Sequence, residues 1–225
     1  MSILSALDIV RGPVSRPWGI AAVVLIAILL FVHWGGLNER LEEGVAWIPL
    51  QSRNLDPGAL YAGEGVQGSD QRIFARLSLP EGEGPFPAAV LLHGSLGFSA
   101  LQRSYADTLN DSGYVVLSVD SFSGRDVADV VGHQEAVSIE SMVADAFAAL
   151  RLLKAHPKVD GNAIGLLGWS KGGSAALAVG RTVFRERLSG EGDRFSSIAA
   201  IYPWCGARER GVRRDDIPIL FIYQH

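Results

Sequence analysis

The chain has 225 residues, which is enough for one α/β domain and an appended segment. Its formal net charge of −4 is mild, and the densest basic cluster, residues 208–214, is balanced by neighbouring acids, so charge predicts no nucleic-acid partner. The single cysteine, Cys205, excludes an internal disulfide and leaves the redox compartment undetermined.

The first predicted element is a membrane helix over residues 18–34. Its interior is uncharged and a tryptophan stands at each end, which suits the two membrane interfaces; as a helix it would span about 25 Å. Arg11 and Arg16 favour a cytoplasmic tail over residues 1–17, with the rest of the chain on the extracytoplasmic side. The alternative is export after signal cleavage, because the apolar run is as short as a signal-peptide core, with a mature chain starting near Trp47.

The segment after the helix, residues 35–69, is interpreted as a linker that becomes an edge strand, and residues 70–225 as the main domain. Apolar and polar residues alternate over 72–79, which predicts a half-buried strand. The continuous apolar run 87–92 predicts a strand covered on both faces of a sheet.

Amphipathic helices and buried strands alternate after that run. Leu101, Tyr105 and Leu109 recur every four residues and predict a helix with these side chains on its apolar face. Residues 114–119 predict another buried strand, and residues 143–153 another helix. This alternation predicts an α/β fold with a mostly parallel sheet and helices on both faces.

A serine between two glycines follows the next predicted strand, residues 163–167. The sequence Gly168-Trp169-Ser170-Lys171-Gly172 matches the G-x-S-x-G pattern of a nucleophile elbow, a strained turn that tolerates no side chain at the flanking glycines. Such a turn exposes the Ser170 hydroxyl as a nucleophile and directs the Lys171 N–H at the same point, where it stabilises an oxyanion. A glycine-rich turn with an idle serine is the alternative.

Five short motifs follow one another in the main domain. They are HGSLG at 93–97, GYVVLSVDSF at 113–122, PKVDGN at 157–162, GWSKGG at 168–173 and IYPWC at 201–205. Together they resemble the dienelactone hydrolase branch of the α/β-hydrolase superfamily. The resemblance covers roughly residues 70–225. It implies a three-layer α/β sandwich and hydrolysis of small esters or lactones through an acyl-enzyme on Ser170.

The resemblance also implies the rest of the oxyanion hole. The loop after His93-Gly94 matches the family's second oxyanion element, which assigns the second amide to Ser95, with Leu96 as the fallback. His93 is assigned a structural role in that loop. Many family members carry cysteine at the elbow, whereas the serine here depends more strongly on a histidine base. No cofactor and no metal is expected, because the chain has no dinucleotide fingerprint, phosphate loop or metal-ligand cluster.

The acid and histidine of the triad follow the nucleophile in the chains of this fold. The strands predicted after the elbow are 198–202 and 217–223, so both groups are expected beyond residue 225 and the domain is interpreted as C-terminally incomplete. Three alternatives stay open. One is a non-catalytic, membrane-tethered binding protein, and another is a serine peptidase of the prolyl oligopeptidase kind. The third is a triad rebuilt from internal residues, with Glu209 as the acid and His133, His156 or His225 as the base.

Overall fold

The computed structural model describes residues 44–57, 66–189, 192–204 and 213–223. The predicted cytoplasmic tail, 1–17, and the predicted membrane helix, 18–34, lie outside the described residues. Within those four ranges, no helix combines the length and the apolar character needed to cross a bilayer.

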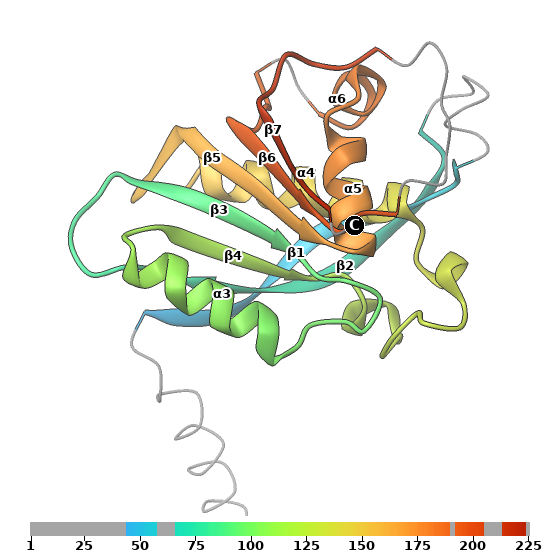
Figure 1. The fold of residues 1–225 in the computed structure, drawn as a ribbon, viewed down its shortest axis with the longest axis horizontal. Helices are drawn as coiled ribbons and strands as arrows, with labels where there is room; N and C mark the ends of the chain where they lie inside the picture. The colour runs from blue at the N-terminus through green and yellow to red at the C-terminus, as the bar shows by residue number, and fades with distance from the viewer. Residues whose placement is uncertain (1–43, 58–65, 190–191, 205–212, 224–225) are drawn as a thin grey trace, which may run out of the picture. The chain divides into compact units, whose positions relative to one another are not determined.

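The described ranges form one seven-stranded sheet in the order β1-β2-β4-β3-β5-β6-β7 (Figure 1). The strands are β1 Val45–Leu55, β2 Gly68–Ser78, β3 Phe86–Leu92, β4 Val115–Asp120, β5 Val159–Trp169, β6 Ser197–Ile201 and β7 Ile219–Ile222. β2 pairs antiparallel with β1 and with β4, and all other neighbouring strands are parallel. The prediction of an α/β fold with a mostly parallel sheet is therefore confirmed.

Helices cover both faces of this sheet (Figure 1). They are α3 Ala100–Asp111 on one face, and α4 Ile139–Lys154, α5 Lys171–Val179 and α6 Thr182–Leu188 on the other. β3 shows how both faces are buried: Ala88, Val90 and Leu92 pack in the cluster under α4 and α5, and Ala89 and Leu91 pack with α3. The apolar run of β3 is thus explained by two covered faces.

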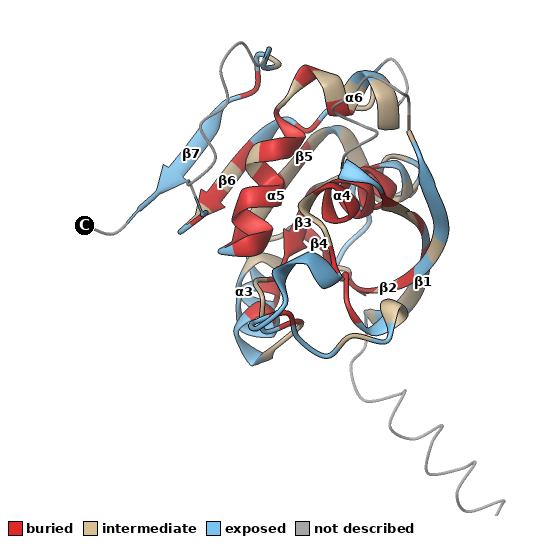
Figure 2. Ribbon diagram, turned by 90° about the vertical axis from the view of Figure 1, so that its right-hand side faces the viewer, coloured by how far each residue is buried: buried red, intermediate tan, exposed pale blue. Residues whose placement is uncertain are grey.

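The two edges of the sheet differ in character. β1 is the edge strand expected within residues 35–69, and it pairs with β2 over its whole length. β7 continues the parallel register on β6 at the other edge. Its four apolar residues are all exposed, from 37% for Ile219 to 60% for Leu220 (Figure 2).

Helix α3 confirms a predicted helix and only part of its predicted apolar face. Leu101 and Tyr105 are 53% and 42% exposed, whereas Gln102 and Ala106 are buried. The small Ala106 side chain packs in the cluster beneath the helix. Gln102 turns inward because its side-chain oxygen accepts the Ser99 N–H (3.1 Å) in a capping box. Of the three residues predicted on the apolar face, Leu109 packs against this cluster, and the Tyr105 ring lies 4.8 Å from the ring of buried Trp169. Leu101 alone is turned to solvent.

Candidate active site

Ser170 occupies the bend between β5 and α5. Its backbone angles are φ 51° and ψ −115°, and a positive φ is uncommon for a residue other than glycine. This conformation costs about 1–3 kcal/mol and persists only where the surroundings enforce it. Two backbone hydrogen bonds do so, since Ser170 N–H donates to Ile201 O (2.9 Å) and Ser174 N–H donates to Ser170 O (2.9 Å). The turn has the strained strand-to-helix geometry expected of a nucleophile elbow.

Glycine is required at the two positions that flank Ser170, because neither has space for a side chain. A β-carbon at Gly168 would lie 2.1 Å from the Gly172 carbonyl oxygen. A β-carbon at Gly172 would lie 2.4 Å from Leu92 O and 2.5 Å from His93 O. Both approaches are far inside van der Waals contact, which explains the spacing of the G-x-S-x-G motif.

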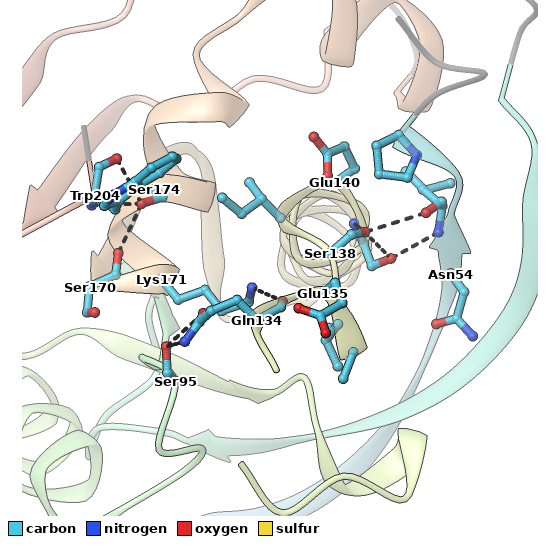
Figure 3. A pocket seen from close by; sticks show the side chains of 16 residues that line it. Asn54, Ser95, Gln134, Glu135, Ser138, Glu140, Ser170, Lys171, Ser174 and Trp204 are labelled. Atoms are coloured by element: carbon cyan, nitrogen blue, oxygen red, sulfur yellow. Dashed lines mark hydrogen bonds between the residues drawn. The ribbon is translucent and has the colours of Figure 1, made fainter. Parts of the chain in front are cut away.

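Ser170 opens onto a cavity of about 980 Å³ (Figure 3). The volume is within the usual range for small-molecule sites. One wall comes from the elbow and the end of β6, and the opposite wall from β1 and the residues at the start of α4. The lining residues are Asn54, Leu55, Pro57, Ser95, Gln134, Glu135, Ala136, Val137, Ser138, Ile139, Glu140, Ser141, Ser170, Lys171, Ser174 and Trp204.

The loop after β3 meets the elbow at this cavity. A β-carbon at Gly94 would be 3.4 Å from the Ser170 β-carbon and 4.0 Å from its hydroxyl oxygen. Ser95, the next residue, lines the cavity, whereas the fallback Leu96 is not among the lining residues. The structure records no acceptor for the Ser95 N–H among the residues it describes. Lys171 begins α5, so its N–H belongs to the first-turn amides, which have no acceptor within the helix. Ser170, Lys171 and Ser95 are therefore brought together at one cavity.

His93 lies directly behind this loop and is fully buried. Its Nε2 accepts the Ser121 N–H (3.1 Å), so its proton is on Nδ1, which donates to Gly94 O (2.8 Å). Burial lowers the pKa of His93 from 6.5, which keeps the ring neutral at pH 7. Both ring nitrogens are thus occupied with the backbone, as the structural role assigned to His93 requires.

The side chain of Lys171 is a site feature that sequence reasoning missed. Lys171 is only 7% exposed, and its Nζ donates to Gln134 O (2.7 Å) across the cavity (Figure 3). Burial lowers the pKa of Lys171, while Glu140 and Glu135 act to raise it. The contact of Lys171 with the loop after β4 could have been expected from topology. That loop lies at the same edge of the parallel sheet as the loops after β3 and β5, which is where the sites of α/β folds form.

The proposed internal triad finds no support among the described residues. His133 is exposed just before the short 3₁₀ turn η4, Gln134–Ala136, and His156 follows α4, where its Nδ1 accepts the Lys158 N–H (3.3 Å). Neither of them lines the cavity. Glu209, Cys205 and His225 lie outside the described residues. The triad acid and histidine expected beyond residue 225 stay a prediction. Across the described ranges, no group of three or more His, Cys, Asp or Glu side chains is arranged to hold a metal ion.

A sequence model of the dienelactone hydrolase family matches residues 73–190, which run from β2 to the end of α6. The chain belongs to the dienelactone hydrolase family. This match contains the loop after β3, the elbow and the start of α4, which together provide most of the cavity wall. The family resemblance is confirmed over this range, which contains four of the five motifs.

Two curated relatives show how far the similarity extends. The chain is 32% identical over 148 residues to acyl-coenzyme A amino acid N-acyltransferase 2 of Rattus norvegicus, which covers 62% of this chain and 33% of the relative. It is 37% identical over 109 residues to mitochondrial acyl-coenzyme A thioesterase 2 of Mus musculus, covering 48% of this chain and 22% of the relative. This dienelactone hydrolase family member therefore matches a third or less of each relative's length.

A solved structure shows the same fold. The crystal structure of a putative dienelactone hydrolase from Klebsiella pneumoniae superposes with a TM-score of 0.52 at 14% identity, covering 78% of this chain and 72% of that chain. At this identity the superposition establishes the α/β-hydrolase fold of the family member.

Proposed function

We propose that this protein is a serine hydrolase that cleaves small carboxylic esters or lactones through an acyl-enzyme on Ser170. The observation that carries the proposal is Ser170 itself, held at positive φ and exposed at a cavity of about 980 Å³. Membership of the dienelactone hydrolase family supports the same chemistry. The apolar side chains in the opposite wall, Leu55, Val137 and Ile139, suit the hydrocarbon part of a small acyl or alcohol group.

The proposed reaction has two steps. Ser170 Oγ attacks the ester carbonyl and gives its proton to a histidine, while the amides of Lys171 and Ser95 donate to the resulting oxyanion. The tetrahedral intermediate collapses with cleavage of the ester C–O bond, and the alcohol leaves with that proton. Water then attacks the acyl-enzyme with the same histidine as base, which releases the carboxylic acid and restores Ser170. The histidine and its acid partner are expected outside the described residues.

The direct test is hydrolysis of p-nitrophenyl acetate by the full-length protein and its Ser170→Ala variant. Loss of the nucleophile should lower kcat by about a thousandfold or more. Ser104→Ala is the matched control, since Ser104 is an exposed serine on α3. If Ser170→Ala hydrolysed the ester at the wild-type rate, Ser170 would not be the nucleophile, and a non-catalytic binding protein would become the better interpretation.

Thioesters are a second candidate substrate class. Several curated relatives of this chain are named acyl-coenzyme A thioesterases. The same elbow and oxyanion donors serve a thioester, with cleavage of the C–S bond in place of the C–O bond. A panel of an acetate ester, a lactone, an acetyl thioester and a proline-containing peptide would rank the substrate classes. Preference for the peptide would instead favour the prolyl oligopeptidase alternative.

We further propose that residues 18–34 anchor the protein in a membrane, with the hydrolase domain on the extracytoplasmic side. The support is the uncharged run between two tryptophans and the arginines that precede it. Membrane fractionation and mass spectrometry of the mature amino terminus test this. A membrane-bound chain that retains residue 1 is expected, and a chain starting near Trp47 would show cleavage instead.

A further inference from the structure

One loop between β4 and α4 holds Ser95 from two sides. The Val130 N–H donates to Ser95 O (2.9 Å). The side-chain amide of Gln134 lies against the Ser95 hydroxyl, with Nε2 at 3.0 Å and Oε1 at 3.1 Å from Oγ. The carbonyl and the side chain of Ser95 are therefore both engaged by residues 130–134, and its N–H has no acceptor among the described residues.

The same glutamine also contacts the elbow. Lys171 Nζ donates to the backbone oxygen of Gln134 at 2.7 Å. Figure 3 shows both contacts: the Gln134 side chain is directed at Ser95, and the Lys171 side chain reaches the Gln134 backbone. Ser95 lies in the loop after β3 and Lys171 is the first residue of α5, far apart in the sequence, and Gln134 touches the side chains of both.

We propose that Gln134 is a positioning residue that sets the spacing of the two oxyanion donors. The inference rests on the proposed function, because Ser95 and Lys171 are the residues assigned to the oxyanion hole. Two amides stabilise an oxyanion only when both lie at hydrogen-bond distance from it, so their spacing has to be held during the reaction. Gln134 provides that link through its side chain on one side and its carbonyl on the other.

Within the part of the chain that the structure describes, the hydrogen bonds of Gln134 are those to Ser95 and Lys171. The residue is exposed and lies in the short turn η4, outside the buried clusters of the core. Removal of its amide group therefore takes away little burial, and the variant is expected to fold. An effect of this substitution on turnover would then come from the site and not from general instability.

The test compares kcat and KM of the full-length wild type with Gln134→Met, Ser95→Ala and the double variant. Methionine keeps the length of glutamine without the amide, and Ser95→Ala keeps the backbone N–H. Each single variant should lower kcat by roughly tenfold with KM changed less than about twofold, because the interaction matters most in the transition state. The double variant should be no worse than about twofold below the slower single variant, since both remove one contact.

A second readout is the binding of phenylboronic acid, which forms a tetrahedral adduct with a serine hydroxyl. Calorimetry measures this binding without turnover. Gln134→Met should weaken it by about the same factor as kcat/KM, because the adduct uses the oxyanion hole. Val131→Ala is the control, as Val131 is an exposed side chain of the same loop that does not line the cavity.

The outcomes separate this inference from the proposed function. If Ser170→Ala abolishes turnover while Gln134→Met keeps wild-type kcat and wild-type boronic acid affinity, Gln134 does not position the donors, although the hydrolase assignment stands. Additive losses in the double variant would also overturn the inference, since they would show two separate contributions. If Ser170→Ala leaves turnover unchanged, the proposed function itself fails.

Discussion

Gly94 packs against Ser170 so closely that a β-carbon at position 94 would lie 3.4 Å from the Ser170 β-carbon and 3.3 Å from Trp169 O. The first residue after His93 is thus in contact with the bend that carries the nucleophile. The oxyanion loop and the elbow are packed as one unit, and a change in either is expected to move the other.

Gly94→Ala should therefore slow the reaction more than it destabilises the fold. The added methyl group meets contacts that are tight but not impossible, so Ser170 would shift by a few tenths of an ångström. We expect kcat to fall by about tenfold and the free energy of unfolding to change by about 1 kcal/mol or less. Parallel ester kinetics and urea unfolding measure the two effects. A variant with wild-type kcat would show that the loop and the elbow move independently.

Gly172→Ala should damage the fold itself. Its β-carbon would lie 2.4 Å from Leu92 O, a clash with backbone that no side-chain rotation relieves. We expect a loss of about 1–3 kcal/mol in the free energy of unfolding, together with loss of esterase activity. Gly132→Ala is the matched control, because a β-carbon there meets nothing within 4 Å. Equal stability of the two variants in thermal unfolding would contradict the steric argument.

The buried ion pair between Arg125 and Asp145 should be sensitive to loss of one partner. Asp145 is fully buried, and its two oxygens accept from the guanidinium at 2.8 and 2.9 Å, with the Ser52 hydroxyl as a further donor. Arg125→Met leaves a buried carboxylate unpaired and should cost about 3–5 kcal/mol in the free energy of unfolding.

The exposed pair between Arg53 and Asp70 provides the comparison for that experiment. Its atoms are 3.7 Å apart and the Asp70 side chain is 95% exposed. Solvent screens such a pair, so Asp70→Asn should cost about 0.5 kcal/mol or less. Arg125→Met/Asp145→Leu should recover part of the loss of Arg125→Met, since no charge then remains buried. Similar losses for Arg125→Met and Asp70→Asn in urea unfolding would refute the assignment.

Stability should fall in mild acid because of His93. Burial lowers the pKa of His93 in the folded protein, whereas in the unfolded chain it titrates near 6.5. Above pH 6.5 His93 is neutral in both states, and its contribution to the free energy of unfolding is complete. As the pH falls below 6.5, His93 binds a proton in the unfolded chain but not in the folded protein, so that contribution is lost progressively down to the lower pKa of the folded state. The free energy of unfolding of wild type should drop more between about pH 7.5 and about pH 5.5 than that of His93→Gln. Parallel pH profiles would argue against a buried neutral ring.

The elements that could be predicted from the sequence are those encoded locally. The apolar run of β3 and the glycines around Ser170 each reflect a constraint that acts within a few residues, namely burial on two faces and a turn without space for side chains. The elbow could therefore be located before its geometry was known. The burial of the small Ala106 in place of Leu101 could not be predicted, because it depends on how closely α3 approaches the sheet.

The opposite wall of the cavity was also beyond sequence reasoning. Residues 121–138 show no periodic pattern, and the contacts of Gln134 with Ser95 and of Lys171 with Gln134 join residues far apart in the chain. Arg125 likewise looks like a surface residue in the sequence, and only the fold places it beside Asp145. Such contacts follow from topology, which brings the loops after β3, β4 and β5 to one edge of the sheet.

The elbow and the facing wall of the cavity differ in how strongly their residues are constrained by the fold. The glycines that flank Ser170 are enclosed by backbone atoms, and so these two positions tolerate almost no variation. In the facing wall, by contrast, Pro57, Glu135 and Ala136 are exposed residues that the core does not need. Substitutions at such positions, whether natural or engineered, can therefore change the substrate specificity while the nucleophilic serine stays in place.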